Sequence, residues 1–247
     1  MGELYWLKRP IAHRGLHDAR RGIEENSISA VKAAMGKGLA VEVDLQSAAN
    51  GMPLVYHDAT LDRLTSESGP VAERDVETLR ATPFKEGGDR ILSLPDLLEL
   101  VDDAVPLLLE VKSDFRRKGI FEANIARQLA GYRGPVAVMS FDPFSIAAFR
   151  HEAPSLPRGL VSCSFTDERA RRDFTTLQRL AMRHLLTAAF ARPNFIAYDI
   201  RALPAAAPLI AKFVAGLPLL AWTVRTEADL ERGLRYADAP IFEEIEP

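Results

Sequence analysis

The chain alternates short apolar runs with longer segments in which apolar residues recur every three or four positions. Short apolar runs bounded by turn-forming residues predict buried strands, and the three-to-four-residue repeat predicts amphipathic helices. The predicted strands cover 9–14, 39–45, 106–112, 136–141, 158–165, 195–200, 218–224 and 239–242. The predicted helices cover 25–37, 94–102, 119–132, 143–152, 168–190, 205–215 and 227–236. Strands that are joined in this way by helices predict an α/β protein with a closed parallel (β/α)8 barrel, the TIM-barrel architecture.

The connection between the second and third predicted strands interrupts this alternation. About sixty residues lie there, with a turn at Asn50-Gly51, a short strand at 52–56 and a polar segment at 60–90. An insertion that follows a barrel strand lies at the carboxyl face, where it can cover a site. Only residues 243–247 follow the last predicted strand, so we expect the usual closing helix to be missing or replaced by the amino-terminal residues.

Length and composition limit the class of protein. A chain of 247 residues with 47% apolar content suits one domain, residues 1–247, with a large core. The net charge of −3 and the scattered basic residues argue against a nucleic-acid partner. No stretch approaches the roughly 20 apolar residues of a membrane-spanning helix, and residues 1–10 lack the apolar core of a signal peptide. Because Cys163 is the single cysteine, we expect a soluble, cytoplasmic protein; nothing specifies an oligomeric state.

Acidic residues stand at the carboxyl ends of two successive predicted barrel strands. The second ends in Val41-Glu42-Val43-Asp44 and the third in Leu109-Glu110-Val111-Lys112. Residues two apart in a strand face the same way, so Glu42 points with Asp44, and Glu110 points with Lys112. Carboxylates held side by side in a poorly solvated place repel each other unless a cation lies between them. Three carboxylates without a nearby cysteine favour Mg²⁺ or Ca²⁺ over zinc, and the alternative is a salt bridge to arginine or lysine at the strand ends.

Two histidines and two cationic side chains accompany these acids. His13-Arg14 ends the first strand, and His57 follows the short strand of the insertion. The guanidinium of Arg14 matches phosphate oxygens, and Lys112 suits a second phosphate contact. Two imidazoles can accept and donate a proton near neutral pH, although a single histidine at a strand end is as often structural. Asn26, at the start of the first helix, is close enough to the strand ends to touch a metal or a phosphate.

A series of short motifs runs along nearly the whole chain. They are His13-Arg14-Gly15, Glu25-Asn26-Ser27, Glu42-Val43-Asp44, Val55-Tyr56-His57-Asp58 with Leu61, Arg63 and Thr65, Leu109-Glu110-Val111-Lys112, Ser140-Phe141 and Ala221-Trp222-Thr223-Val224. Together these motifs resemble those of the glycerophosphodiester phosphodiesterase family, and the segment at about 59–88 is similar to the insertion of that family.

The resemblance implies a metal-dependent barrel enzyme acting on a small-molecule phosphodiester. Such an enzyme hydrolyses a glycerophosphodiester to an alcohol and sn-glycerol 3-phosphate. The resemblance implies that His13 and His57 are the acid/base pair. It implies that Glu42, Asp44 and Glu110 hold the metal. It also implies that Arg14 and Lys112 bind the phosphate. The attacking group is either water or the glycerol 2-hydroxyl, and the second choice would give a cyclic phosphate first.

The end of the eighth strand departs from the family pattern. Many members end this strand with a Thr-Asp-x-Pro turn, whereas this chain has Ile241-Phe242-Glu243-Glu244-Ile245. We expect Glu243 and Glu244 to be a solvated chain end, because charged terminal residues usually face water. The alternative is a contact with a cationic head group such as choline or ethanolamine.

Two aromatic residues near strand ends are candidate substrate contacts. Phe141 and Trp222 are as consistent with the core as with a pocket, since aromatic side chains dominate interiors. In the seventh strand, Leu220, Trp222 and Val224 share one face. If that face points into the barrel, Trp222 caps the site and its ring packs against the carbon skeleton of glycerol.

Two other functions fit the same fold. A phospholipase-type barrel that acts on a lipid or inositol phosphodiester would share the paired histidines and the metal site, but it would recognise an inositol ring and release diacylglycerol. A catalytically silent binding barrel would keep the fold with an impaired site. The acid/base, metal and phosphate positions are all filled here, which argues against the silent barrel.

Overall fold

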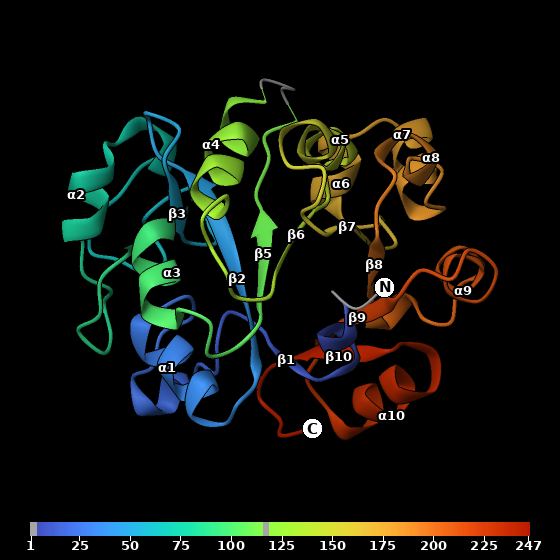
Figure 1. The fold of residues 1–247 in the computed structure, drawn as a ribbon, viewed down its shortest axis with the longest axis horizontal. Coiled ribbons are helices and arrows are strands. Elements are labelled where there is room, and N and C mark those ends of the chain that lie inside the picture. Colours follow the sequence, from blue (N-terminus) through green and yellow to red (C-terminus); the bar gives the residue numbers. More distant parts are fainter. Residues whose placement is uncertain (1–3, 116–118) are drawn as a thin grey trace.

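Eight parallel strands close into a barrel in the computed structural model, which describes residues 4–115 and 119–247 (Figure 1). The barrel strands are β1 (Ile11–Ala12), β2 (Ala40–Ser47), β5 (Leu107–Val111), β6 (Val136–Ser140), β7 (Arg158–Ser162), β8 (Phe195–Asp199), β9 (Leu219–Val224) and β10 (Ala239–Phe242). Each pairs in parallel with its neighbours, and β1 closes the ring because it pairs with both β10 and β2. The predicted TIM barrel is confirmed.

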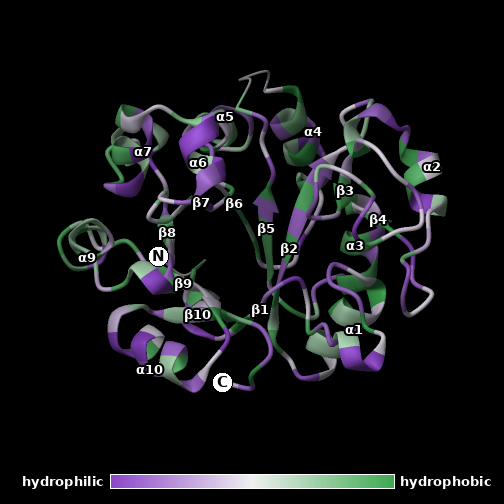
Figure 2. Ribbon diagram, turned by 180° about the vertical axis from the view of Figure 1, so that it is seen from behind, coloured by the Kyte–Doolittle hydropathy of each residue, from purple (hydrophilic) through white to green (hydrophobic). Residues whose placement is uncertain are grey.

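Helices surround the strands, and several begin at a residue whose side chain caps the helix, such as Ser27 and Ser93. The helices of the barrel are α1 (Ile28–Gly36), α3 (Leu94–Val101), α4 (Ile120–Leu129), α5 (Pro143–Glu152), α6 (Glu168–Asp173), α7 (Thr176–Arg183), α8 (Ala188–Ala191), α9 (Ala206–Phe213) and α10 (Glu227–Tyr236). Short 3-10 turns are η1 (Tyr5–Lys8), η2 (Ala19–Arg21), η3 (Val71–Glu73) and η4 (Ile200–Ala202). Helix α10 carries alternating hydrophilic and hydrophobic bands, as a helix covering a barrel requires (Figure 2). Within the described residues, none of the helices has the length and apolar character needed to cross a bilayer.

The prediction of one helix over 168–190 is wrong, because the segment is divided into α6, α7 and α8. Phe174 adopts an extended conformation that ends α6. Thr175 then begins α7, since its side chain accepts a hydrogen bond from the backbone N–H of Gln178 and the Gln178 side chain accepts one from the backbone of Thr175. This reciprocal capping begins a separate helix at Thr175, although the apolar repeat continues through the segment.

Two apolar layers lie on the opposite faces of the barrel strands. Side chains such as Val41 and Val43 of β2 pack outward against the helices, whereas Ala40 packs inside the barrel. Glu42 and Asp44 continue this inward face toward the carboxyl end of the strand, as the period of two requires. Trp6 and Leu7 of η1 join the inner layer, so the amino-terminal residues fill the opposite end of the barrel.

The segment between β2 and β5 forms a small subdomain with its own apolar core. Strand β3 (Pro53–Val55) pairs antiparallel with β2, and β4 (Leu92–Ser93) pairs antiparallel with β3. Helix α2 (Val76–Ala81) lies on the outer side of this segment (Figure 1). The apolar core of this subdomain consists of Ala48, Leu54, Tyr56, Leu61, Leu64, Val71, Leu79, Phe84 and Ile91. The chain thereby returns to the carboxyl ends of the barrel strands immediately after β3, at His57.

We predict that Gly15→Ala destabilises the fold far more than Gly38→Ala. Both glycines have a positive φ, +76° and +65°. A Cβ at Gly15 would lie 2.7 Å from the carbonyl carbon of Ala30, whereas no atom lies within 4 Å of the corresponding position at Gly38. The left-handed conformation costs about 1–2 kcal/mol in each variant, and overpacking adds about 1–3 kcal/mol at Gly15 alone. Urea unfolding measures both losses, and equal losses would contradict the packing argument.

Candidate active site

Three carboxylates from two adjacent strands meet inside the carboxyl end of the barrel. Glu42 and Asp44 come from β2 and Glu110 from β5, and the pairing register places Asp44 directly beside Glu110. One oxygen of each carboxylate lies within 4.8 Å of the others, and all three residues are buried. Neighbouring parallel strands alone therefore bring together the three acids that the sequence selected.

Glu42 is the carboxylate of the cluster that no lysine or arginine side chain of the described residues contacts. Its Oε2 accepts a hydrogen bond of 2.9 Å from the backbone N–H of Arg14, but no lysine or arginine side chain pairs with it among the described residues. Its Oε1 is buried and has no hydrogen-bond partner in that part of the chain. Burial, with the charges of Asp44 and Glu110, raises the pKa of Glu42 well above its usual value. An orphaned oxygen in a cluster of three carboxylates fits a hard divalent cation, which Glu42, Asp44 and Glu110 could hold through their oxygens.

Asp44 is, by contrast, surrounded by donors. Lys112 Nζ lies 2.7 Å from its Oδ1, and Arg14 Nε lies 3.1 Å from its Oδ2. Asn26 donates a hydrogen bond of 2.9 Å from Nδ2 to Oδ2 and accepts one of 3.1 Å from the Asp44 backbone N–H. Burial raises the pKa of Asp44, but Lys112 and Arg14 outweigh it and lower the pKa. Lys112 also contacts the carboxylate of Glu110, so the salt bridge considered as an alternative forms at two of the acids and not at Glu42.

His13 lies at the end of β1, between two acids. Its Nδ1 contacts Glu243 Oε2, and its Nε2 lies 3.9 Å from Glu42 Oε2. The other oxygen of Glu243 accepts a hydrogen bond of 2.5 Å from Arg225 Nε, and His17 Nε2 lies 3.4 Å from Oε2. Burial raises the pKa of Glu243, but its hydrogen bonds with His13 and His17 outweigh this and lower the pKa. An ionised Glu243 binds the His13 Nδ1–H and thereby leaves Nε2 as the basic nitrogen.

The prediction that Glu243 belongs to a solvated chain end is wrong, because its side chain is only 10% exposed and contacts His13. Glu244, the next residue, is exposed as expected. Strand β10 ends beside β1 in the closed barrel, so residues 230 positions apart become neighbours. A residue near the end of the chain is solvated only if no strand pairing holds it, and here the pairing of β10 with β1 holds Glu243.

His57 has a carboxylate partner of its own. Its Nδ1 lies 2.7 Å from Asp58 Oδ1, and its backbone carbonyl accepts a hydrogen bond of 3.0 Å from Gln46 Nε2. Burial is the largest influence on His57 and lowers its pKa, although Asp44 and Asp58 act against it. A neutral ring that donates Nδ1–H to Asp58 keeps a lone pair on Nε2. His13 and His57 both line one large cleft of about 2190 Å³ at the carboxyl face.

An aromatic wall lines the same cleft. The rings of Phe141 and Trp222 meet edge to face, with centroids 5.4 Å apart, and Phe165 continues the row. Leu220 belongs to the inner layer of the barrel, and Trp222 packs against that layer and lines the cleft, so the condition set for Trp222 as a substrate contact is met. Val224 packs in the outer layer, so its assignment to the same face is wrong. The pairing of β10 with β9 shifts register between Pro240 and Phe242, beside this change of face.

Several residues of the site were not selected as candidates by the sequence reasoning. Glu25 accepts a hydrogen bond of 2.7 Å from Arg14 Nη1, and Arg63 contacts both Glu25 and Asp58. The only signal in the sequence for Glu25, Asp58 and Arg63 was their presence in the motifs around Asn26 and His57. The orientation of their side chains depends on the docking of the insertion against the barrel.

Comparison of the sequence with known protein families identifies the family of this chain. The sequence profile of the Glycerophosphoryl diester phosphodiesterase family matches residues 13–243. The chain belongs to this family. A glycerophosphodiester phosphodiesterase of Caldanaerobacter subterraneus subsp. tengcongensis is 31% identical over 161 residues, 61% of this chain and 65% of that protein. Glycerophosphodiester phosphodiesterase 1 of Mus musculus is 39% identical over 160 residues, 64% of this chain and 43% of that protein. The matched stretch spans less than two thirds of either relative.

Solved structures of phosphodiesterases share the fold of this family member. A phosphodiesterase of Oleispira antarctica, in complex with the product sn-glycerol-3-phosphate, superposes with a TM-score of 0.77 at 19% identity, covering 95% of this chain and 92% of that one. A glycerophosphodiester phosphodiesterase of Agrobacterium tumefaciens gives a TM-score of 0.70 at 21% identity, with 95% of each chain covered. At these identities the likeness shows the fold.

We predict that Glu42→Gln and Asp44→Asn change the stability of the metal-free protein in opposite directions. The raised pKa of Glu42 means that ionising it disfavours the folded state once the pH rises above the unfolded value of about 4.3. Glu42→Gln should therefore be as stable as the wild type or more stable near neutral pH. Asp44→Asn removes the buried carboxylate that Lys112 and Arg14 share, which should cost about 3–5 kcal/mol.

Urea unfolding in the presence of a chelator, near pH 5 and near pH 7.5, measures both effects. The advantage of Glu42→Gln should grow with pH, because the unfolded chain releases the Glu42 proton above about pH 4.3, whereas the raised pKa keeps that proton on the folded wild type. The lowered pKa of Asp44 means that its contribution is present above its unfolded pKa and disappears only in strong acid. A large loss of stability in Glu42→Gln would show that Glu42 serves a structural ion pair.

Proposed function

We propose that this protein is a metal-dependent glycerophosphodiester phosphodiesterase that releases an alcohol and sn-glycerol 3-phosphate. One observation carries the proposal: the carboxylate cluster lies next to His13, Arg14 and Lys112, and His57 lines the same cleft. The family and the known activity named for its relatives, the glycerophosphodiester phosphodiesterases, support the same activity. A silent binding barrel would not need two imidazoles in the same cleft as a cluster of buried carboxylates.

The phosphate site is proposed to consist of Arg14 and Lys112. Both cations lie beside Asp44, and both line the cleft. A phosphodiester is an anion, and its phosphoryl oxygens gain further charge as the attacking oxygen adds to phosphorus. Fixed cations at these oxygens stabilise the transition state more than the bound substrate, because they need no reorganisation during the reaction. A bound Mg²⁺ or Ca²⁺ would supply further neutralisation of the phosphoryl oxygens, held by Glu42, Asp44 and Glu110.

His13 and His57 are proposed as the acid/base pair. Each ring is oriented by a carboxylate at Nδ1, Glu243 for His13 and Asp58 for His57. This arrangement leaves Nε2 of each ring for the substrate, so that one histidine can take a proton from the attacking water or glycerol 2-hydroxyl while the other gives one to the departing alcohol. Proton transfer matters because an unprotonated alkoxide is a poor leaving group.

Trp222 and Phe141 are proposed to contact the carbon skeleton of the substrate. They form the edge-to-face pair in the wall of the cleft, on the inner layer of the barrel. The solved phosphodiesterase of Oleispira antarctica holds sn-glycerol-3-phosphate as its product, which supports glycerol phosphate as the part of the substrate that such a cleft retains. An apolar ring face suits the C–H groups of glycerol, whereas the cations suit its phosphate.

The activity is tested with a panel of glycerophosphodiesters that differ in the alcohol, such as the choline, ethanolamine and inositol esters. We expect release of glycerol 3-phosphate, loss of this release after exhaustive chelation, and recovery on adding Mg²⁺ or Ca²⁺. Glu42→Gln should bind the cation less tightly and remain inactive when the cation is restored. Turnover that persists undiminished after chelation would refute the metal dependence, and no release from any ester would refute the activity.

We also predict that His13→Ala and His57→Ala each lower kcat by at least about a hundredfold, the low end of acid/base contributions. Because a proton is taken and given in one displacement, the double variant should lose much less than the product of the two single losses. His151→Ala, which removes an exposed imidazole on α5, is the matched control and should leave kcat unchanged. Steady-state kinetics decide the question, and multiplicative losses would mean that the histidines act independently.

A further inference from the structure

Arg63 joins two carboxylates that come from separate parts of the chain. It donates hydrogen bonds to both oxygens of Asp58, of 2.6 Å from Nε and 3.0 Å from Nη2. It also donates to both oxygens of Glu25, of 2.7 Å from Nη2 and 3.1 Å from Nη1. Asp58 and Arg63 belong to the segment between β2 and β5, whereas Glu25 lies just before α1. One guanidinium is therefore shared by two carboxylates that have no direct contact in the structure.

Each of these carboxylates leads to a residue of the proposed reaction. Asp58 contacts Nδ1 of His57 at 2.7 Å. Glu25 accepts a hydrogen bond of 2.7 Å from Nη1 of Arg14, and Nε of Arg14 lies 3.1 Å from Oδ2 of Asp44. Positive and negative groups thus alternate from Asp44 through Arg14, Glu25 and Arg63 to Asp58, and the series ends on the His57 ring. Arg63 is the only one of these groups that connects the insertion to the barrel.

We propose that Arg63 is a positioning residue that fixes the spacing between His57 and Arg14 through Asp58 and Glu25. The proposal rests on the function proposed above. A guanidinium is planar and offers five donors in a rigid fork, so it can bind two carboxylates at once. An ammonium is a point charge on a flexible stem and cannot hold both in a fixed geometry. Arg63 is not among the described residues that line the cleft, so it would act on the reaction through the orientation of His57 and Arg14 and not by touching the substrate.

The charges of this series are mutually consistent. Burial raises the pKa of Glu25, but the hydrogen bond from Arg63 and the charge of Arg14 outweigh it and lower the pKa. Burial likewise raises the pKa of Asp58, and its hydrogen bonds with Arg63 and His57 lower it. Both carboxylates stay ionised at neutral pH, so each can accept from two donors at once. Without Arg63, Glu25 and Asp58 would each lose one of these donors.

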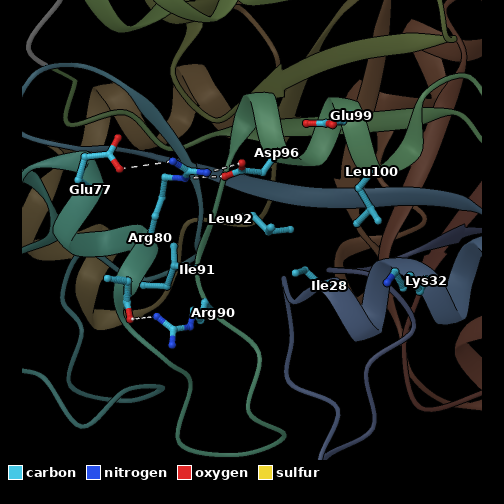
Figure 3. Close-up of a pocket in the computed structure, with 11 residues that line it drawn as sticks. Ile28, Lys32, Glu77, Arg80, Arg90, Ile91, Leu92, Asp96, Glu99 and Leu100 are labelled. Atoms are coloured by element: carbon cyan, nitrogen blue, oxygen red, sulfur yellow. Dashed lines mark hydrogen bonds and ion pairs between the residues drawn. The ribbon is translucent and has the colours of Figure 1, made fainter.

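A second arginine of the insertion supplies a matched control. Arg80 donates hydrogen bonds of 2.8 and 2.7 Å to the two carboxylate oxygens of Asp96. It donates a third, of 3.4 Å, to Glu77 (Figure 3). Its side chain is 41% exposed, against 47% for Arg63, so the two sites are similarly solvated. Arg80 lines a different pocket, of about 590 Å³, with residues of α1, α2 and α3. This pocket contains none of the proposed catalytic residues, so a loss in Arg80 variants reports only the anchoring of the insertion.

The kinetic test compares Arg63→Lys with Arg80→Lys in the metal-loaded protein. Misplacing a catalytic group by about 1 Å can cost about a hundredfold, so Arg63→Lys should lower kcat about 10–100-fold. KM should change less than about threefold, because Arg63 does not touch the substrate. Arg80→Lys should leave both constants unchanged, and the two variants should melt at similar temperatures. Unchanged kcat in Arg63→Lys, or equal losses in both variants, would overturn the proposal.

A spectroscopic test does not depend on turnover. The ¹⁵N shifts of the His57 ring at one neutral pH report which nitrogen carries the proton, and the metal-free wild type should show Nδ1–H. In Arg63→Lys the Asp58 carboxylate loses its anchor, so the spectrum should move toward a mixture of the two tautomers. An unchanged His57 spectrum would overturn the proposal. If the wild type hydrolyses no glycerophosphodiester, the proposed function fails while this measurement still decides whether Arg63 positions His57.

Discussion

The buried carboxylate of Asp44 is the interaction on which the rest of the site depends. A fully buried negative charge is costly unless donors surround it, and here Lys112, Arg14 and Asn26 do so. Asn26 receives and returns a hydrogen bond with Asp44, and this exchange ties the start of α1 to β2. Because each partner also serves another contact, the charge of Asp44 fixes the positions of the cations, the first helix and the neighbouring acids together.

Two residues of the cluster respond in opposite ways to the same burial. Asp44 is stabilised as an anion, whereas Glu42 is held close to other acids with one oxygen unpaired. A site made only for stability would have paired both carboxylates or replaced them by apolar groups. The unpaired oxygen destabilises the isolated chain, and the proposed cation would recover this loss, as cation binding does at metal sites in general.

The two histidines are supported in parallel ways by unrelated parts of the chain. Glu243 orients His13 from the last barrel strand, and Asp58 orients His57 from the insertion. In both cases the carboxylate is itself held by an arginine, Arg225 for Glu243 and Arg63 for Asp58. In each case the arginine holds the carboxylate, and the carboxylate holds Nδ1 of the imidazole ring. The ring therefore has a fixed orientation, and its Nε2 points in one direction at the cleft.

The sequence by itself determined the barrel and the inward acids. Alternating strand and helix patterns located the eight barrel strands, and the period of two placed Glu42, Asp44 and Glu110 on one face, because both signals are local. Only the tertiary structure decided the partners of Glu243 and Arg63. Glu243 meets His13 because the ring closes between β10 and β1, and Arg63 meets Glu25 because the insertion folds back over the barrel. Such contacts depend on pairing between segments far apart in the chain, for which no local pattern of residues carries information.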